Sequence, residues 1–358
     1  MRMDPRIPPD SHYMQLPREV LIGKQVAPLV GETLIRLGIH GRALIVTGPK
    51  VKSIAADTVF ASLNGVGFSV ETIVVEGSTT EQVSLVESQI HRFLPDIIVG
   101  VGGGKDIDVA KLSSMHCSKQ FLSVPTAASH DGIASPLVSM KGLDRPYSYV
   151  AHSPIAIVAD TSIIGKSPYR LIASGCGDIV AKYTAVRDWK LAHRIKNEYY
   201  GDYAAELAIM SSRLVMKNAS SIRTVSGSGV RTLVEALISC GVAMSIAGTS
   251  RPCSGAEHLF SHYLTMIAPK PALHGEQCGV GTILCAYLHG ANWELIKDVL
   301  HKIGAPTNAT ELEVDPKYVV EALTKAHSIR PERYTILGES GLTKEAAERV
   351  ATMTGVTD

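Results

Sequence analysis

The sequence lacks several features that mark specialised classes of protein. Its formal net charge is only +1, which excludes the concentrated basic surface that binds nucleic acid or anionic membranes. No apolar run approaches the length of a membrane span. The first residues (MRMDPRIPPDSHYMQLP) are polar and proline-rich and lack the apolar core of a signal peptide. We therefore expect a cytoplasmic protein without nucleic-acid partners and without membrane insertion.

Cysteine pairing motifs are also missing. The six cysteines form no C-x-x-C pair, so we expect buried thiols rather than a disulfide framework. The rest of the composition, 45% hydrophobic and 19% charged, is typical of a globular chain. At 358 residues the chain is long for a single core and suits two domains.

One glycine-rich stretch dominates the first half of the chain. In DIIVGVGGGKDIDVAK, residues 96–111, an apolar strand runs into Gly102, Gly103 and Gly104, and a helical pattern follows at once. Glycines let the backbone approach a ligand closely, and the free N–H groups at a helix start attract an anion. The pattern favours a phosphate site, although glycine used for turn geometry alone stays open. It is not the usual dinucleotide fingerprint, because Ile107 stands where G-x-G-x-x-G requires its third glycine.

Strand and helix patterns alternate up to about residue 164. Buried strands are predicted at 43–48, 68–75, 97–101, 121–124 and 154–159, with helices between them and a short strand within 17–24. This alternation predicts a doubly wound, Rossmann-like parallel sheet. After it, helical patterns such as 199–218, 229–247 and 279–288 dominate. We predict an α/β nucleotide-binding domain at 1–164 and an all-helical domain at 165–358, with a ligand in the cleft between them.

The helical half contains metal-type ligands in apolar surroundings. Asp178 follows Gly175-Cys176-Gly177, which we expect to open a helix at 179–191. His258 and His262 are four residues apart and share a helix face, and His274 follows. Asp178, His258 and His274 would suit Zn²⁺ or Fe²⁺ with open positions for a substrate oxygen. The alternative of ordinary core histidines stays open, since no compact motif such as H-E-x-x-H is present.

A polar loop completes the set of motifs. PTAASHDGIASP, residues 125–136, follows a strand and brings hydroxyls, an aspartate and a glycine to the edge of the predicted sheet. An edge loop of this kind either takes part in a site or is a long surface turn.

Taken together in this order, GGGKDIDVAK, PTAASHDG, SGCGD, H-x-x-x-H and the later histidine resemble the metal-dependent alcohol dehydrogenases related to dehydroquinate synthase. Within that superfamily the chain is most similar to the archaeal sn-glycerol-1-phosphate dehydrogenases, over essentially its whole length. The DGIASP run distinguishes it from glycerol dehydrogenases. The resemblance implies a dehydroquinate synthase-like fold and the reduction of dihydroxyacetone phosphate by NADH or NADPH for ether phospholipid synthesis. It also implies one Zn²⁺ per subunit and a homo-oligomer, a dimer or a multiple of dimers.

The resemblance implies a role for each of the residues singled out. The expected metal ligands are Asp178, His258 and His274, and the expected substrate contacts are Asp131, Asp178 and His262. The metal would polarise the substrate carbonyl, so Asp178 and His262 are also the expected catalytic residues, and His130 is a second candidate proton relay. The expected cofactor contacts are Gly102, Gly103, Gly104, Lys105, Asp106, Ile107, Asp108, Thr126, Ala127, Ala128, Ser129 and Ser135.

Two further expectations concern phosphate groups. Many NAD-selective relatives carry an acidic residue after the first long strand, whereas here the strand ends Thr47-Gly48-Pro49-Lys50. We predict that this site tolerates the 2′-phosphate of NADPH, with Lys50 as its partner. A phosphorylated substrate needs a cation as well. Lys270, Arg251 and Lys141 lie near the motifs in sequence and are candidates for it, although a surface role is open for each.

Three rival functions share parts of this pattern. A glycerol or other polyol dehydrogenase would ignore the substrate's phosphate. A dehydroquinate synthase-like lyase would use the same metal and NAD without net NAD turnover, but would need more basic residues in the helical domain. A non-catalytic nucleotide-binding module would leave Asp178, His258 and His274 unexplained.

Overall fold

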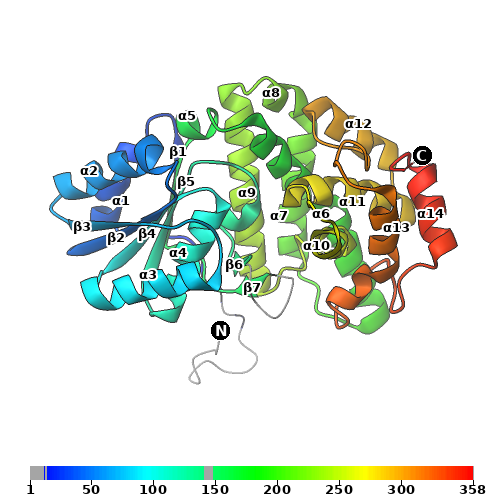
Figure 1. Ribbon diagram of the computed structural model, residues 1–358, viewed down its shortest axis with the longest axis horizontal. Helices are drawn as coiled ribbons and strands as arrows, with labels where there is room; N and C mark the ends of the chain where they lie inside the picture. The colour runs from blue at the N-terminus through cyan, green and yellow to red at the C-terminus, as the bar shows by residue number, and fades with distance from the viewer. Residues whose placement is uncertain (1–11, 13, 141–147, 358) are drawn as a thin grey trace.

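The computed structural model describes residues 12, 14–140 and 148–357, and it consists of two packed halves (Figure 1). The first half is a parallel sheet covered by helices on both faces. In the described residues that follow the last strand, which ends at Asp160, all regular structure is helical. The prediction of an α/β half followed by a helical half is therefore confirmed.

Six strands form the sheet in the order β1-β8-β5-β4-β2-β3, with every neighbouring pair parallel. The strand order changes direction between β2 and β4, because β3 lies outside β2 while β5 and β8 lie outside β4. In such sheets, ligands bind beyond the carboxyl ends of the strands at this switch point. The strands are β1 Glu19–Gly23, β2 Arg42–Thr47, β3 Ser69–Val74, β4 Ile97–Gly102, β5 Gln120–Pro125 and β8 Ala156–Asp160.

The central strands are apolar on both sides because both faces of the sheet are covered. In β2, Leu44 and Val46 join one hydrophobic cluster with residues of α3 and α4, and Ala43 and Ile45 join a second with residues of α1 and α2. The first cluster continues into the helical half. The predicted domain boundary after Ile164 falls at the end of α5, and it stays a prediction. The helices of this half are α1 Val30–Arg36, α2 Asp57–Gly65, α3 Thr80–Phe93 and α4 Gly104–His116.

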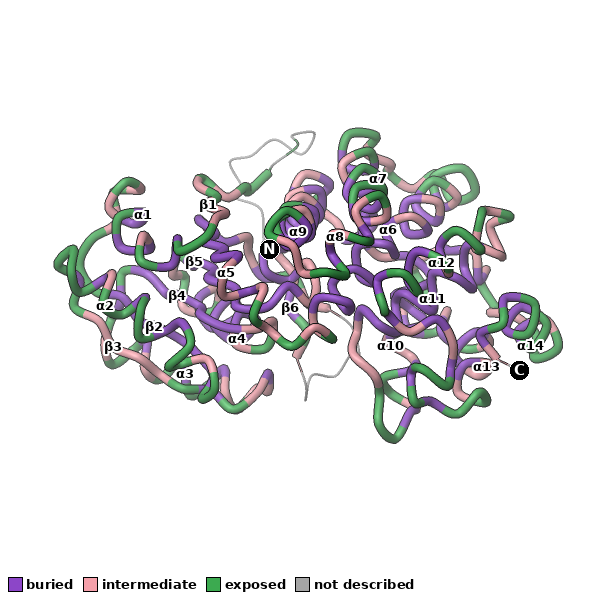
Figure 2. The backbone as a smooth tube through the Cα atoms, turned by 90° about the horizontal axis from the view of Figure 1, so that it is seen from above, coloured by how far each residue is buried: buried purple, intermediate pink, exposed green. Residues whose placement is uncertain are grey.

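The helical half is built around α6, which packs against α7, α10 and α11. Figure 2 shows long buried stretches along α6 and α11, whereas α14 carries exposed residues along its length. The elements are α5 Thr161–Ile164, α6 Tyr169–Lys196, α7 Asp202–Lys217, α8 Ala219–Arg223, α9 Gly227–Ala247, α10 Ala256–Ile267, α11 His274–Leu288, α12 Trp293–Ile303, α13 Pro316–Lys325, the 3-10 turn η4 Ala326–Ile329 and α14 Lys344–Met353.

One predicted helix boundary was wrong. The segment Gly175-Cys176-Gly177-Asp178 does not open a helix but lies inside α6, with Asp178 near its middle. Its glycines serve close packing rather than termination. A Cβ at Gly175 would lie 1.9 Å from the carbonyl oxygen of Ala128, and one at Gly177 would lie 2.2 Å from that of Gly275. Contact between backbones therefore outweighs the low helix propensity of glycine here.

Two features were not anticipated. A short antiparallel pair, β6 Leu137–Val138 with β7 Tyr149–Val150, is too brief for a sequence pattern to reveal. In addition, α9 is long and apolar enough, by length and composition alone, to span a membrane. The expectation that no apolar run approaches this length was therefore wrong for α9. About 67% of that window is buried inside the protein, as expected of a core helix. It packs against α7 and against the turn η3 Asp131–Ile133.

Candidate active site

The glycine loop lies at the switch point of the sheet. β4 ends at Gly102, α4 starts at Gly104, and the backbone N–H of Thr126, after β5, donates to the Gly102 carbonyl oxygen at 2.9 Å. The Asp106 carboxylate folds back to accept from the Gly103 N–H at 3.1 Å, and burial raises the pKa of Asp106 to about 6. Strand end, glycines and helix start therefore stand at the edge where a phosphate is expected.

Several predicted cofactor residues are buried in the wall of this edge rather than open to it. Ile107 and Ala128 are fully buried, and the Asp108 carboxylate accepts from the Ser139 N–H at 3.0 Å. Burial raises the pKa of Asp108, although the ammonium of Lys111 opposes it. Lys111 in turn donates to the carbonyl oxygens of Gly132 and Leu137 at 2.6 and 2.7 Å. These charges hold the loop that follows β5 in place.

That loop connects the two halves of the site. Its remaining predicted cofactor residues, Thr126, Ala127 and Ser135, are also buried, while Ser129 is partly exposed and its carbonyl oxygen accepts from the Ser174 hydroxyl of α6. The His130 ring accepts from the Gly132 N–H at 2.9 Å and lies directly against Gly104, where a Cβ would meet its Nε2 at 2.0 Å. His130 therefore lies over the glycine loop.

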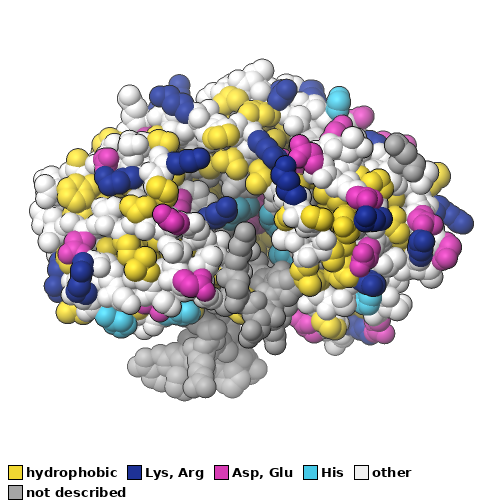
Figure 3. Space-filling view, viewed as in Figure 1, with side chains coloured by type: hydrophobic (Ala, Val, Ile, Leu, Met, Phe, Trp, Pro, Cys, Tyr) yellow, Lys and Arg dark blue, Asp and Glu magenta, His cyan; other side chains and the backbone are white. Residues whose placement is uncertain are grey.

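The helical half brings the three predicted metal residues together. Asp178 of α6, His258 of α10 and His274 of α11 each place a ligand atom within 4.8 Å of the others, together with Cys278 of α11. The Asp178 Oδ1 lies 3.3 Å from His258 Nε2, and the His258 and His274 rings are 5.1 Å apart. Figure 3 shows histidine side chains in the hollow between the two halves.

Buried neighbours orient these ligands. His258 Nδ1 lies 2.8 Å from a carboxylate oxygen of Glu257, a fully buried side chain that also accepts from the Gly255 N–H and the Thr184 hydroxyl. This contact turns Nε2 toward Asp178, as carboxylate partners do for metal-binding histidines. Burial alone would lower the pKa of His258, but Cys278, Asp178 and Glu257 raise it well above its usual range.

A buried lysine links the metal-type cluster to the loop. Lys182, one turn after Asp178 on α6, places its Nζ 2.8 Å from Asp178 Oδ1 and 2.8 Å from Asp131 Oδ2. The Asp131 N–H also donates to Asp178 Oδ2 at 2.9 Å. Burial would lower the pKa of Lys182, but Asp131 and Asp178 hold it well above its ordinary value. The predicted substrate contact Asp131 is therefore tied directly to the predicted metal ligand Asp178.

His262 lies beside this cluster, as the spacing on α10 predicted. Its ring is 5.5 Å from that of His274 and 6.5 Å from that of His258. Burial and the two neighbouring histidines lower the pKa of His262 well below its usual range, so its ring is neutral near neutral pH. A neutral imidazole at this position is able to pass a proton.

The candidates for a phosphate-binding cation do not lie free in the site. Lys270 is exposed and pairs with Glu313, and Arg251 is buried in an ion pair with Glu198. Lys141 lies outside the described residues. Because both charges are already paired with carboxylates, neither Lys270 nor Arg251 offers a free cation to the site.

Sequence reasoning missed three further polar residues of the cluster: Lys182, Cys278 and Thr184. Two of them carried a usable signal, because Lys182 stands four residues after Asp178 and Cys278 four after His274, on the same helix faces. Burial alone would raise the pKa of Cys278, but His258 and His274 lower it to about 6. Cys278 thus offers a sulfur donor beside the carboxylate and the two imidazoles.

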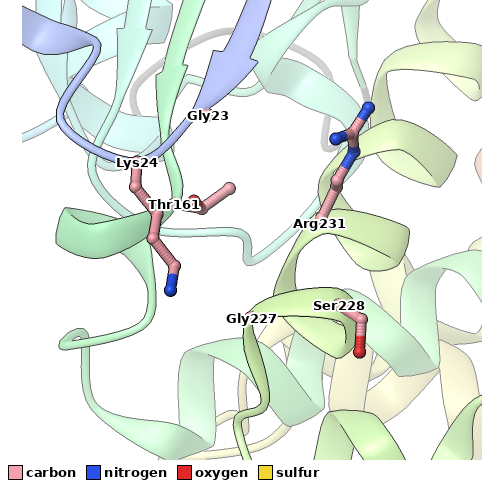
Figure 4. A pocket seen from close by; sticks show the side chains of 6 residues that line it. All are labelled: Gly23, Lys24, Thr161, Gly227, Ser228 and Arg231. Atoms are coloured by element: carbon pink, nitrogen blue, oxygen red, sulfur yellow. The ribbon is translucent and has the colours of Figure 1, made fainter.

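A separate hollow of about 400 Å³ lies where β1 meets the start of α9 (Figure 4). It is lined by Gly23, Lys24, Thr161, Gly227, Ser228 and Arg231. None of the metal-type residues borders it, so it is distinct from the site just described.

Comparison with known proteins decides the family. A family model described as iron-containing alcohol dehydrogenase matches residues 21–168. The glycerol-1-phosphate dehydrogenase (NAD(P)+) of Thermococcus sibiricus is 53% identical over 345 residues, which are 96% of this chain and 98% of the relative. That of Methanothermobacter thermautotrophicus is 51% identical over 347 residues, 97% and 99% of the two chains. The chain belongs to the glycerol-1-phosphate dehydrogenase family.

Solved structures show that this glycerol-1-phosphate dehydrogenase family member has the fold predicted for it. Glycerol dehydrogenase from Schizosaccharomyces pombe superposes with a TM-score of 0.75 at 19% identity, covering 97% of this chain and 94% of the other. Sulfoacetaldehyde reductase from Bifidobacterium kashiwanohense, solved with NAD+, also gives 0.75, at 17% identity and covering 97% and 100%. The dehydroquinate synthase-like fold class is confirmed.

Proposed function

We propose that this protein reduces dihydroxyacetone phosphate to sn-glycerol 1-phosphate with NADH or NADPH. Near full-length identity of 53% to a glycerol-1-phosphate dehydrogenase carries the proposal. The geometry supports it, because the glycine loop and the metal-type cluster are joined by one segment, residues 126–133, that contacts both. A nicotinamide cofactor and a ketone bound at these two places would meet in the cleft.

The donor set fits a divalent metal ion. One carboxylate, two imidazoles and a thiol converge within 4.8 Å of one another, and Zn²⁺ takes oxygen, nitrogen and sulfur ligands of these kinds. We propose Asp178, His258 and His274 as its ligands, one Zn²⁺ per subunit, with Cys278 as an additional donor. When bound, the ion would act as a Lewis acid toward the C2 carbonyl of the substrate.

The protein's own side chains have distinct tasks in this reaction. Glu257 fixes the orientation of the His258 ring. Lys182 holds Asp131 and Asp178 in place through ion pairs, and Asp131 stands beside the ligand cluster as the proposed substrate contact. Because the nicotinamide delivers a hydride to C2, the substrate oxygen must take up one proton, and His262 is placed to relay it.

The cofactor contacts are proposed along the carboxyl edge of the sheet. Gly102, Gly103 and Gly104 would lie against the pyrophosphate, with Lys105 and Asp106 at the start of α4. Lys50 follows β2, which neighbours β4 at the switch point, and its side chain is exposed. It would contact the 2′-phosphate of NADPH. We also propose that the protein acts in the cytoplasm as a homo-oligomer and that its product enters ether phospholipid synthesis.

The deciding experiment follows oxidation of the cofactor by its absorbance at about 340 nm. The purified protein is mixed with NADPH or NADH and either dihydroxyacetone phosphate or dihydroxyacetone, then assayed again after chelation and after Zn²⁺ is restored. We expect oxidation with the phosphorylated ketone, lost on chelation and regained with zinc, and sn-glycerol 1-phosphate as the product by chiral analysis.

Other outcomes point to the rival functions. Faster turnover of dihydroxyacetone than of its phosphate would indicate a polyol dehydrogenase. No oxidation with either ketone would contradict the proposal and leave the lyase or a nucleotide-binding module to be tested.

A further inference from the structure

Two arginines outside the predicted site stand at the start of α10, the helix that carries His258 and His262. Arg330 and Arg333 follow η4, which packs against α10. The Arg333 Nη1 donates to the Ser254 carbonyl oxygen at 2.6 Å, just before that helix begins. Ser254 stands four residues before His258, the first histidine of the metal-type cluster on α10.

The two guanidinium groups lie close to each other. Arg333 Nη2 donates to the Ser250 hydroxyl at 2.6 Å, and Arg330 Nη1 reaches the same hydroxyl at 3.5 Å. Arg330 Nη2 also donates to the Ser148 carbonyl oxygen, next to β7, at 3.1 Å. Ser148 belongs to the α/β half and Ser250 to the helical half, so the pair lies where the two halves meet.

Positive charge is in excess around Arg333. Among the described residues, no carboxylate lies within ion-pairing distance of it, and the nearby Glu198 is already held by Arg251. Burial lowers the pKa of Arg333 to about 9, and the like charges of Arg330 and Arg251 act in the same direction. Its hydrogen bonds to Ser254 and Ser250 use two of five N–H donors. A guanidinium taken out of water without a carboxylate partner, as for Arg333 among the described residues, is costly unless an anion joins it.

The arginine pair stands at the end of α10 that carries His258. Arg333 donates to Ser254 just before this helix begins, and η4, which precedes both arginines, packs against it. The glycine loop that would hold the cofactor's phosphates stands instead at the switch point between β2 and β4, in the other half. A phosphate in contact with Arg333 would therefore belong to the molecule bound next to His262.

We propose that Arg333, together with Arg330, binds the phosphate group of the ketone substrate and makes the site selective for the phosphorylated over the bare ketone. The inference rests on the proposed function and names the cation that sequence proximity had sought in Lys270, Arg251 or Lys141. A guanidinium is suited to this task because its planar fork binds two phosphate oxygens at once.

The test compares two substrates in the full-length protein. Initial rates are measured with dihydroxyacetone phosphate and with dihydroxyacetone for the parent protein, Arg333→Met and Arg330→Met. For Arg333→Met we expect KM for the phosphorylated ketone to rise roughly tenfold to a hundredfold, the loss typical of a hydrogen-bonded charged group. The kcat/KM for dihydroxyacetone and the KM for NADPH should both stay within about twofold of the parent values.

A second measurement tests the phosphate site with an anion that is not covalently attached to the ketone. In the parent protein, inorganic phosphite added to dihydroxyacetone should accelerate its reduction, because the anion fills the site that the missing phosphate leaves. Arg333→Met should abolish this acceleration, and Arg333→Lys, which keeps the charge but not the fork, should retain part of it. Lys270→Met, in an exposed ion pair, serves as the matched control and should change neither readout.

The outcomes separate this inference from the proposed function. If the parent protein does not reduce dihydroxyacetone phosphate, the proposed function fails. If it does, but Arg333→Met leaves KM unchanged or weakens both ketones equally, the arginine assignment is wrong. If Arg333→Met raises only the KM for NADPH, Arg333 contacts the cofactor, and the assignment to the substrate phosphate is wrong as well. If thermal unfolding shows that Arg333→Met is not folded, Arg333→Lys and Arg330→Met take its place. The ratio of kcat/KM for the phosphorylated and the bare ketone is then compared with that of the parent protein.

Discussion

The two halves of this molecule offer ligands different kinds of groups. At the edge of the sheet, the candidate cofactor site consists mainly of backbone, with Gly102 to Gly104 and the first N–H groups of α4. In the helical half, the candidate metal site consists of charged side chains that are almost wholly buried. Asp178 is 1% exposed, and Glu257 and Lys182 are fully buried. Backbone donors come with the fold, whereas buried charges depend on one another for neutralisation.

This difference predicts in which half of the molecule substitutions have large effects. An exposed side chain at the sheet edge, such as that of Lys50, borders solvent and a site built from main chain, so its replacement removes one weak contact. Removing one member of the buried network leaves its partners charged and without compensation. We therefore expect large effects in the helical half and small ones in the α/β half, and four experiments test that contrast in descending order of effect.

The largest effect is expected for Asp178→Asn. Losing a charged ligand that also binds Lys182 should reduce kcat/KM by roughly a thousandfold or more, since Lewis-acid stabilisation is worth several kcal/mol. Steady-state kinetics and elemental analysis of bound metal measure the two consequences together. The control is Asp57→Asn, an exposed aspartate of the α/β half, which should match the parent. Full metal content and activity in Asp178→Asn would remove Asp178 from the ligand set.

Lys182→Met should mainly lower stability. It leaves the buried Asp178 and the partly buried Asp131 without their cation, and breaking a buried pair typically costs about 3–5 kcal/mol. Urea unfolding of metal-free protein measures the loss, and Lys190→Met, on the exposed side of the same helix, provides the reference. A free energy of unfolding within about 0.5 kcal/mol of the parent would show that the network does not depend on Lys182.

His152→Gln tests a buried titratable group of the α/β half. His152 lies 2.8 Å from the Ser114 hydroxyl, and burial, with help from Lys111, lowers its pKa to about 4. In the unfolded chain this histidine takes up a proton near pH 6.5, whereas the buried ring stays neutral down to about pH 4. The contribution of His152 to the free energy of unfolding is therefore complete above about pH 6.5 and is lost progressively as the pH falls toward about 4. The neutral glutamine should reduce the loss of unfolding free energy between about pH 7.5 and 5 by up to about 2 kcal/mol.

Urea titrations at the two pH values measure this change, and the exposed His40→Gln should leave the pH dependence as it is. An unaltered pH dependence in His152→Gln would mean that His152 titrates normally in the folded protein.

The smallest effect is expected for Lys50→Glu at the sheet edge. Reversing one exposed charge beside the proposed 2′-phosphate should shift the ratio of kcat/KM for NADPH and NADH toward NADH by roughly tenfold, about 1.4 kcal/mol. Lys52→Glu, two residues further on and paired with Asp57, controls for a general change of charge. An unchanged cofactor preference would make the assignment of Lys50 wrong.

Features that are contiguous in the sequence were predicted well. The run of apolar strands, the glycine loop after β4 and the long helices of the second half follow from local patterns, because hydrophobic periodicity and glycine act within a few residues. The spacing of His258 and His262 on one helix face is of the same kind. Residue types alone suggested Asp178, His258 and His274 as a ligand set but left ordinary core histidines open, and the resemblance to a family favoured the ligand set.

Features that depend on packing were missed. Gly175 and Gly177 looked like a helix start, yet they lie inside α6. There the missing side chain leaves room for the backbone of other segments, which occupies the space that a Cβ would need. Glu257 adjoins His258 in sequence, but only the fold shows that it is fully buried and oriented onto the ring. Lys270 and Arg251 were near the motifs in sequence, whereas Arg333, far from them along the chain, reaches the start of α10.

The sequence by itself determined the α/β and helical halves, the glycine loop and the residue types available for a metal, since these depend on composition and short-range periodicity. Only the tertiary structure decided which charges meet. Lys182 bridges Asp131 and Asp178, Cys278 joins the histidines, and Arg333 stands at the start of α10 without a carboxylate partner among the described residues. The physical reason is that the free energy of a charge depends on burial and on neighbours from other segments, and both are set only when α6, α10, α11 and the loop after β5 pack together.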